Sequence, residues 1–498
     1  MAVVRTEVCG IPTFVAEAPG PVIAALIFRV GMCDEALPIR GISHLCEHLA
    51  LSSLDQRDHP FNGFVTSNLT HFVVQGTADE VVQHFADVSA ALRDLPVARF
   101  DKEIGILRAE AAGQPNVILD LLLKRRYGAR GYGRVGFPEY GLRRLTADDA
   151  VTWAMQRFGA SAATLWIAGP DAEGVAARCE LELPTGEAVP LPSLDTIFRP
   201  PGRAELDVLG PCLAVVGRRS PSLIAALAIL HLRLEREARH ERALTYSIGA
   251  TYEPLTDDLA HAQVGFDAEP AHHQEAVDAL YSVLDAYGDG PTDDEVERHI
   301  RLTKASWADP HHGTLMAQHL AKELLLGSED TLEDIEQRTL GISVQSIKDA
   351  FSQSMAAALL ISPRGTKAPD NRLLLLSEWS LHEVEGREFR PVAKEPRGQR
   401  AIVSSAGVTY RVVPGKHITV RAEACEALAH WDDGTRAMVG SDGFSLMLAP
   451  WEWHEGDQLI DAVDAAVAPE RWIPMGEGDG QPEDDTGRGR KLWRARKR

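Results

Sequence analysis

The most informative short motif is formed by His44, Glu47 and His48, which have the spacing H-x-x-E-H. Side chains four residues apart on a helix lie one above the other, so the two imidazoles can reach one metal ion. Glu47 lies at the edge of the same face, within reach of a water molecule at the metal. The motif therefore predicts two metal ligands and a general base, if the segment is helical and another acidic side chain completes the site.

The flanking sequence supports a helix at the motif. An apolar strand, Val22–Val30, leads into a loop bounded by Pro38 and Gly41. Ser43 is a suitable N-cap for a helix that runs from the motif towards Ser52. We therefore expect the motif on a helix that follows a buried strand.

A second helix is predicted to begin near Phe100 and to carry Glu103 and Glu110. These two residues are seven positions apart, which is two helical turns, so both carboxylates lie on one face. Acidic side chains on one face can complete a metal site or hold one of its ligands by a hydrogen bond.

The composition narrows the classes of partner. The chain has 498 residues, with 51 basic and 72 acidic side chains and a net charge of −21. This balance argues against nucleic acid or an anionic membrane as the main partner and is compatible with basic peptides. Six scattered cysteines indicate reduced thiols, and neither a signal peptide nor a membrane-spanning apolar run is recognisable. A cytoplasmic protein is expected.

The order of predicted elements indicates an internal duplication. Residues 1–184 and 205–362 each read as an α+β half, a largely antiparallel sheet covered by helices, and a proline-rich linker over residues 185–204 joins them into a clamshell. In the second half we expect a helix over Ser222–Arg239 and a strand over Leu244–Tyr252. Residues 363–475 predict a small β-rich domain, for which a pleckstrin-homology-like barrel is one candidate. The tail, residues 476–498, has the composition of a disordered segment.

Over roughly residues 5–362 the chain resembles the pitrilysin/insulinase family of zinc metallopeptidases, the inverzincins, and within it the short processing-peptidase-like subfamily. The resemblance rests on the H-x-x-E-H segment and on Gly31-Met-Cys-Asp-Glu35, which leads through Gly41 into it. It also rests on Asn62-Gly-Phe-Val-Thr66, which is similar to the family's Asn-Ala-x-Thr strand with Gly63 in place of alanine.

The resemblance implies a zinc site with one Zn²⁺ per chain. His44 and His48 would be ligands, Glu110 the third ligand, Glu103 an orienting residue and Glu47 the base. Glu110 follows His48 by 62 residues, which is shorter than the family's usual spacing. We therefore expect a deletion between Leu51 and Phe61, and Glu103 is the alternative ligand.

The resemblance also implies a substrate-binding segment in the second half. Arg239 and Tyr246 match the positions that contact the substrate backbone and the reacting carbonyl, and Asn62 could donate to a substrate carbonyl. Because one chain carries both parts, an active subunit and a homodimer are favoured, with a heterodimer of related subunits as the alternative. The implied activity is that of a zinc endopeptidase that hydrolyses peptides or unfolded segments in an enclosed chamber, with a processing or leader peptidase as a more specific version. The competing hypothesis is a catalytically inactive scaffold or binding subunit.

Overall fold

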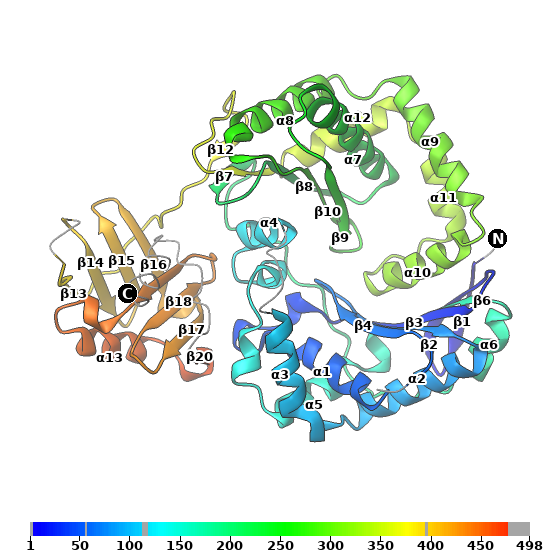
Figure 1. The fold of residues 1–498 in the computed structure, drawn as a ribbon, viewed down its shortest axis with the longest axis horizontal. Helices are drawn as coiled ribbons and strands as arrows, with labels where there is room; N and C mark the ends of the chain where they lie inside the picture. Colours follow the sequence, from blue (N-terminus) through cyan, green and yellow to red (C-terminus); the bar gives the residue numbers. More distant parts are fainter. Residues whose placement is uncertain (1–2, 55–56, 112–117, 394–396, 477–498) are drawn as a thin grey trace.

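The computed structural model describes residues 3–54, 57–111, 118–393 and 397–476. Figure 1 shows two α/β halves facing one another and a third, β-rich unit beside the first half. The predicted disordered tail, from residue 477 onward, lies outside the described residues.

The first half is built on a six-stranded sheet with the order β1-β2-β6-β3-β5-β4. Strands β2 and β6 are parallel, and the other neighbouring pairs are antiparallel. The strands are β1 (Val3–Val8), β2 (Ile11–Glu17), β3 (Val22–Phe28), β4 (Phe61–Val65), β5 (Thr70–Gly76) and β6 (Ala163–Gly169). The helices are α1 (Ile42–Leu51), α2 (Ala78–Arg93), α3 (Phe100–Ala111), α4 (Ile118–Tyr127), α5 (Ala147–Arg157) and α6 (Ala172–Arg178).

The second half has a similar sheet with the order β12-β7-β11-β8-β10-β9, in which the parallel pair β7 and β11 corresponds to β2 and β6. It differs at its edge, where β12 pairs with β7 in parallel but β1 pairs with β2 antiparallel. Its strands are β7 (Gly202–Leu206), β8 (Cys212–Arg218), β9 (Gly249–Pro254), β10 (Leu259–Gly265), β11 (Leu359–Pro363) and β12 (Leu374–Leu375). Its helices are α7 (Pro221–Leu234), α8 (His273–Tyr287), α9 (Asp293–Trp307), α10 (His312–Leu325), α11 (Leu332–Leu340) and α12 (Val344–Met355). The predicted α+β class with two similar halves is confirmed.

Two boundaries differ from those expected. Strand β7 begins at Gly202, inside the segment predicted as linker, and β12 pairs with β7 beyond residue 362. Strand β12 was assigned to the β-rich domain, but Leu373 beside it is buried in the core of the second half. A two-residue strand lacks the alternating pattern that would have indicated its sheet.

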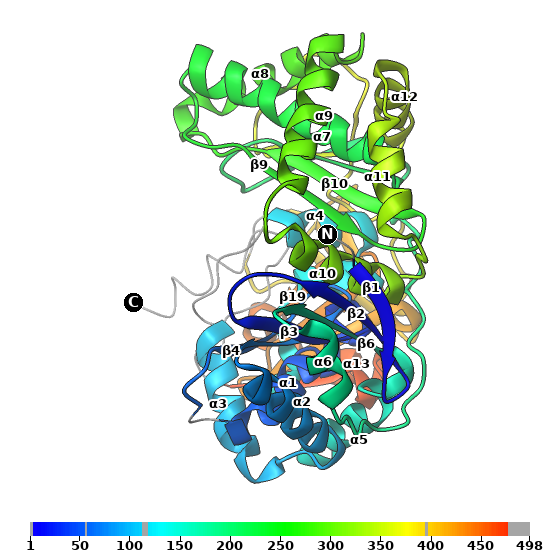
Figure 2. The same ribbon diagram turned by 90° about the vertical axis from the view of Figure 1, so that its right-hand side faces the viewer.

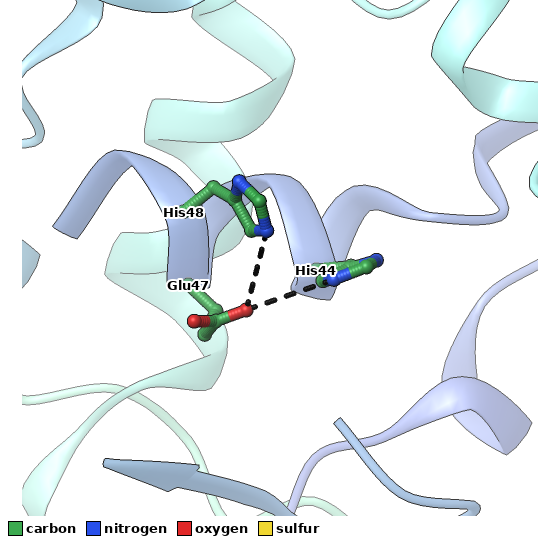
Figure 3. Close-up of side chains that lie close together, drawn as sticks. All are labelled: His44, Glu47 and His48. Carbon is green, nitrogen blue, oxygen red and sulfur yellow. Dashed lines mark ion pairs between the residues drawn. The ribbon is translucent and has the colours of Figure 1, made fainter. Parts of the chain in front are cut away.

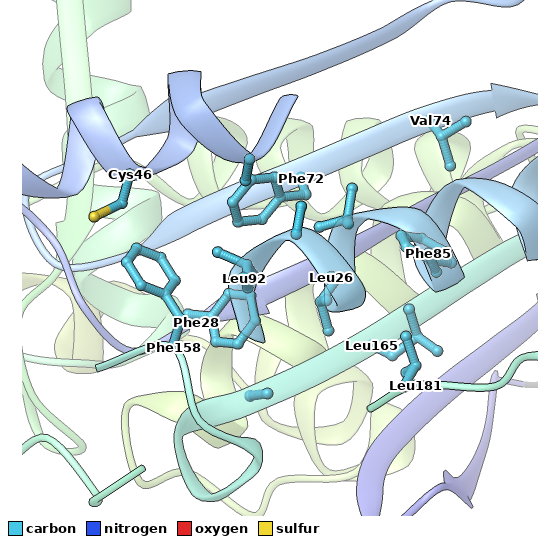
Figure 4. Close-up of a cluster of buried hydrophobic side chains, with 14 of the residues drawn as sticks. Leu26, Phe28, Cys46, Phe72, Val74, Phe85, Leu92, Phe158, Leu165 and Leu181 are labelled. Atoms are coloured by element: carbon cyan, nitrogen blue, oxygen red, sulfur yellow. The ribbon is translucent and has the colours of Figure 1, made fainter. Parts of the chain in front are cut away.

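The core of the first half lies between one face of its sheet and helices α1, α2 and α5 (Figure 4). Alternate residues of β3 and β5 point into it, among them Leu26, Phe28 and Phe72. The rings of Phe28 and Phe158 meet edge to face with centroids 5.2 Å apart. This core fixes α1 against strands β4 and β5.

The other face of each sheet is covered by a helix that belongs, in sequence, to the opposite half (Figures 1 and 2). Helix α10 packs on the first sheet, where Ala317 and Leu320 join Phe14 and Trp166 in one buried cluster. Helix α4 packs on the second sheet, with Leu122 beside Ala214 and neighbouring strand residues. This exchange of helices joins the two halves through buried apolar surface.

Arg126 of α4 ties the halves together and is completely buried. Its guanidinium donates to the carbonyl oxygens of Ala357, at 2.7 Å, and Ala214, at 3.3 Å. Arg126→Met keeps the apolar stem but removes both hydrogen bonds, so we expect the free energy of unfolding to fall by about 2–3 kcal/mol. Denaturant titration measures this, with the exposed Arg178→Met as control; an equal effect in both variants would contradict the role of Arg126.

A buried histidine on β5 makes stability depend on pH. His71 stacks on Phe64 with ring centroids 4.4 Å apart, and burial lowers its pKa to about 3, with the charge of Lys322 adding to the shift. Between pH 6.5 and 3 the unfolded chain therefore binds a proton that the folded chain does not, so stability falls as pH drops through this window. At pH 5 the loss is about 2 kcal/mol. Urea unfolding at pH 7 and pH 5 should show a smaller difference for His71→Phe than for the wild type; an unchanged difference would be evidence against this assignment.

The third unit consists of two four-stranded sheets, β13-β14-β15-β16 and β19-β18-β17-β20, with helix α13 packed against them. Its elements are β13 (Arg387–Phe389), β14 (Arg400–Ser404), β15 (Gly407–Val413), β16 (Lys416–Arg421), β17 (Cys425–Trp431), β18 (Arg436–Gly440), β19 (Ser445–Leu448), α13 (Gly456–Ala466) and β20 (Trp472–Met475). A core of its own, with Tyr410 and Trp453 edge to face, fills the space between them.

The cysteines and the lengths of the helices can be compared with the expectations of reduced thiols and of no membrane-spanning segment. All six cysteines are free, and five of them are buried. Cys46, within the motif, points into the core and donates to the carbonyl oxygen of Ala150 at 3.4 Å, away from the two histidines. Among the described residues, every helix is too short or too polar to cross a membrane.

Candidate metal centre

Helix α1 carries the H-x-x-E-H motif, as predicted, but it begins differently. Its N-cap is Gly41 in the left-handed conformation, φ 99°, and not Ser43. The buried carboxylate of Glu35 accepts hydrogen bonds from the backbone N–H groups of Gly41, at 2.8 Å, and Ser43, at 2.9 Å. An acidic group at a helix N-terminus satisfies free N–H groups and the helix dipole, so Glu35 replaces the expected serine cap.

The imidazoles of His44 and His48 and the carboxylate of Glu47 converge on one point (Figure 3), and the carboxylate of Glu110 lies near the same point. Oε2 of Glu47 lies 3.8 Å from Nε2 of His44 and 4.0 Å from Nε2 of His48. Oε2 of Glu110, on α3, lies 3.9 Å and 3.8 Å from the same two nitrogens. Within the described residues, the triad of His44, Glu47 and His48 is the one group of three or more potential metal-binding side chains with donor atoms within 4.8 Å of one another.

A carboxylate holds the far nitrogen of each imidazole. Nδ1 of His48 lies 3.3 Å from Oε2 of Glu103, and Nδ1 of His44 lies 3.0 Å from Oε1 of Glu139. Hydrogen bonds of this kind place the proton on Nδ1 and leave the lone pair of Nε2 facing the common point. Glu103 was predicted as an orienting residue, whereas Glu139 was missed because its glycine-rich segment carries no periodic pattern.

Burial, more than distance, distinguishes the two convergent carboxylates. Glu47 is 3% exposed, and burial raises its pKa to about 7 although the charge of His44 opposes the shift. The side chain of Glu110 is 44% exposed. A carboxyl group with a pKa near neutrality is suited to accept and return a proton, which favours Glu47 as a base and Glu110 as a ligand.

Gly63 on strand β4 gives Glu47 its position. A Cβ built on Gly63 would lie 2.6 Å from both Cγ and Cδ of Glu47 and would overlap the carboxylate itself. Real side chains do not approach so closely, so the Glu47 side chain fills the space that an alanine methyl group would take. The observed position of the Glu47 side chain therefore requires a glycine at residue 63.

His44 is held close to several acidic groups. Burial lowers its pKa, but the hydrogen bond and charge of Glu139, together with Glu47 and Glu110, outweigh burial and raise the pKa above its ordinary value. Burial also acts on Glu139, but the contact with His44 keeps the pKa of that carboxyl below its usual range. The surplus of carboxylates around the imidazoles favours a positive charge at their centre.

The donor set fits Zn²⁺. Zinc binds imidazole nitrogen and carboxylate oxygen at about 2.0–2.2 Å, so neighbouring ligands of a tetrahedral site lie about 3.4 Å apart. The distances of 3.8 and 3.9 Å from Glu110 to the histidines need a contraction of about 0.5 Å to meet that value. The chemistry of the donors and the anchored Nδ1 atoms both suit a site with three protein ligands.

Asn62 lies on the opposite face of the sheet from the centre. On β4, Gly63 faces Glu47, and successive residues of a strand point to opposite faces. Asn62 pairs with Val73, which packs against the cluster beneath α10 and not against α1. Asn62 therefore does not face Glu47, and Gly63 is the residue of this strand that touches the centre. That Asn62 donates to a substrate carbonyl or positions the site from its strand stays a prediction.

Arg239 and Tyr246 lie together on the second half. Helix α7 ends at Leu234 and continues as a π-helical turn, Glu235–Glu241, and β9 begins only at Gly249, so the predicted strand starts later than expected. Arg239 forms an ion pair with Glu235 at 2.8 Å, and its guanidinium lies over the ring of Tyr246 at 5.3 Å. Tyr246 is 85% exposed. The pair is thus assembled on the second half with the tyrosine free to meet a ligand.

The sequence matches no protein-family model and no curated protein. Solved structures do match. The inactive domain of an M16 peptidase from Pseudomonas fluorescens is 17% identical, with a TM-score of 0.57, over 74% of this chain and 100% of that one. A protease from Helicobacter pylori is 14% identical, with a TM-score of 0.60, over 72% and 99%.

A third similar structure is the first half of the periplasmic protease PqqL from Escherichia coli, 14% identical, with a TM-score of 0.55, over 74% of this chain and 92% of that one. Identities this low speak to fold, and one of the three structures is described as inactive. The chain therefore has the fold of M16-like peptidases.

Proposed function

We propose that the protein is a zinc-dependent endopeptidase that hydrolyses peptides or unfolded segments between its two halves, with one Zn²⁺ per chain. The observation that carries this proposal is the convergence of His44, His48, Glu47 and Glu110, with each Nδ1 held by a carboxylate. In this assignment the two histidines and Glu110 hold the metal, and Glu47 is the base.

In the proposed reaction the side chains of the protein transfer the proton and hold the reacting groups in place. When bound, Zn²⁺ supplies Lewis acidity, which polarises a peptide carbonyl and makes water more acidic. Glu47 accepts a proton from water as it attacks the carbonyl carbon, and then donates it to the leaving amine as the C–N bond breaks. Its buried position beside Gly63 keeps the carboxylate pointed at the imidazoles throughout.

Strand β4 is the edge of the first sheet and lies beside α1, so an extended peptide can add to it as another strand. Main-chain hydrogen bonds would then present successive carbonyl groups to the centre. Arg239 and Tyr246 are proposed to contact the peptide from the second half, with the tyrosine hydroxyl donating to the developing oxyanion. The net charge of −21 favours basic peptides.

Zinc analysis of the purified protein combined with digestion of a peptide library tests the proposal. We expect about one zinc per chain and cleavage that stops when a chelator removes the metal and resumes when zinc is restored. Protein that binds zinc but cleaves no member of the library, or protein without zinc, would speak against the assigned activity.

The second candidate is a catalytically inactive scaffold or binding subunit. It is favoured by the ion pair that engages Arg239 and by the fold similarity to a domain described as inactive. Absence of zinc in the wild-type protein supports this candidate.

The oligomeric state and the cellular compartment are also part of this proposal. A chain that carries both the metal motif and the Arg239/Tyr246 pair favours a homodimer over a heterodimer with a related subunit, and gel filtration with light scattering tests this. A processing or leader peptidase is the more specific version of the activity. Free cysteines favour a reducing compartment such as the cytoplasm.

The contact between Gly63 and Glu47 yields a test that leaves all acidic residues intact. In Gly63→Ala the new methyl group must push the flexible Glu47 side chain aside, so we expect kcat/KM to fall about 100-fold while zinc is retained. The matched control is Gly105→Ala on α3, where a Cβ meets no atom within 4 Å. Wild-type turnover in Gly63→Ala would show that the position of Glu47 is not limiting.

A further inference from the structure

The third unit is docked on the first half through one face of its sheet β19-β18-β17-β20. Seven of its apolar side chains are buried together with Leu37, Ala129, Phe137 and Tyr140 of the first half, and we call this contact the seam. The seven are Ala427, Ala429, Ala437, Val439, Met447, Ile473 and Met475. Their strand neighbours, such as Leu428 and Met438, fill the unit's own core, so the seam uses the outer face of the sheet.

Polar contacts fasten both ends of the first-half segment that the seam covers. Near its start, the backbone N–H of Ala129 donates to the carbonyl oxygen of Ser441 at 3.1 Å, and Arg130 forms an ion pair with Glu426 at 3.1 Å. Near its end, Arg144 donates to the carbonyl oxygen of Trp472 at 3.0 Å. Residues 129–144 thus contact the third unit at both ends and, through Phe137 and Tyr140, near their middle.

Glu139 lies within this fastened segment, between the seam residues Phe137 and Tyr140. On its other side the segment packs directly on the start of α1: a Cβ on Gly41 would lie 2.9 Å from Cβ of Glu139. The backbone N–H of Gly141 also donates to the carbonyl oxygen of Arg40 at 2.9 Å. The segment is therefore enclosed between the third unit and the helix that carries the histidines.

The two carboxylates that hold the imidazoles depend on different supports. Glu103 belongs to α3, a twelve-residue helix anchored in the core of the first half by Leu107. Glu139 lies between two short 3₁₀ turns, Gly131–Gly136 and Tyr140–Arg143, which lack the continuous hydrogen bonding of a helix or sheet. Its backbone position is set by what packs against it, and on one side that is the third unit.

We propose that the C-terminal β-rich unit is a structural part of the metal centre: through the seam it fixes residues 137–142, so that Glu139 orients His44 for metal binding. Glu139 is then a positioning residue. This inference rests on the proposed zinc site.

Zinc affinity, measured by competition with a chromophoric chelator, tests the role of Glu139. Glu139→Ala removes the acceptor for Nδ1–H of His44, and we expect the affinity to fall about 10–100-fold. Glu139→Gln keeps an acceptor oxygen, so it should recover most of that loss. Equal affinities for the wild type and Glu139→Ala, or equal losses in both variants, would overturn the assignment.

A charge in the seam tests the role of the third unit. We expect Ala437→Glu to lower the zinc affinity by a factor similar to that of Glu139→Ala, whereas Ala406→Glu, at an exposed turn of the same unit, should leave it unchanged. If the seam acts through Glu139, the double variant Ala437→Glu/Glu139→Ala binds zinc no more weakly than Glu139→Ala alone. Additive losses would overturn the proposal. If Ala437→Glu does not fold, Met447→Ala opens the same seam without a charge.

Amide hydrogen exchange of the metal-free protein separates this inference from the proposed function. Opening the seam should speed exchange in peptides that cover residues 37–48 and 137–142, and Ala406→Glu should not. If wild-type protein binds no zinc, the proposed function fails, and the exchange experiment still decides whether the third unit holds these segments. Unchanged exchange in a seam variant would refute the proposal that the third unit fixes these segments.

Discussion

Glu47→Gln should retain one zinc per chain and lose peptide cleavage by a factor of about 10²–10⁴. Glutamine has nearly the same shape and fills the space beside Gly63, but its amide cannot accept the proton from the attacking water. Because Glu47 is 3% exposed, bulk water has little access to replace it as a base. Turnover with a library-derived peptide and metal analysis of the same sample measure the two quantities.

Two outcomes would contradict the assignment of Glu47. Undiminished turnover with zinc bound would mean that another group removes the proton. Loss of zinc would mean that Glu47 is a ligand and that the roles of Glu47 and Glu110, which lie at similar distances from both imidazoles, are exchanged. Glu173→Gln, on the exposed surface of α6, makes the same chemical change far from the centre and should be silent in both measurements.

The parts of the centre that could be predicted are those with a local periodic signal. The spacing of His44 and His48 indicated one face of a helix, and Glu103 and Glu110 indicated one face of another; the structure has both helices. Strand β3 is a continuous apolar run and β5 belongs to an alternating segment, and both patterns predict strands from the sequence alone. The doubled order of elements likewise appeared in the predicted halves and is repeated in the two sheets.

The parts that could not be predicted depend on contacts between distant segments. Glu139 sits in a segment without helical or strand periodicity, and its place is set by residues near 437–475, about 300 positions later. Helices α4 and α10 were not predicted. The apolar face of each packs on the sheet of the opposite half, and the sequence around each helix does not show that contact. The face of β4 on which Asn62 lies could not be predicted for a related reason: the motif indicated the strand, but the face depends on its register against β5.

Glu110→Ala and Glu103→Ala should separate a metal ligand from the residue that orients one. Each variant removes one glutamate carboxylate from α3, at positions two helical turns apart, so each is the matched control of the other. Glu103 contacts Nδ1 of His48, the nitrogen that faces away from the common point, and its loss should weaken zinc binding about 10–100-fold. Glu110 faces Nε2 of both histidines, and its loss should weaken binding by more than that and leave the protein without stoichiometric zinc after dialysis.

In thermal unfolding of the metal-free proteins, Glu103→Ala should be the more damaging variant, the opposite of the order expected for zinc affinity. The Glu103 side chain is 5% exposed and also pairs with Arg99 at 3.2 Å, so its removal leaves a partly buried arginine without that partner and lowers the unfolding midpoint. Glu110 is 44% exposed, and its removal should change the midpoint little. If instead Glu103→Ala loses zinc and Glu110→Ala keeps it, Glu103 is the ligand.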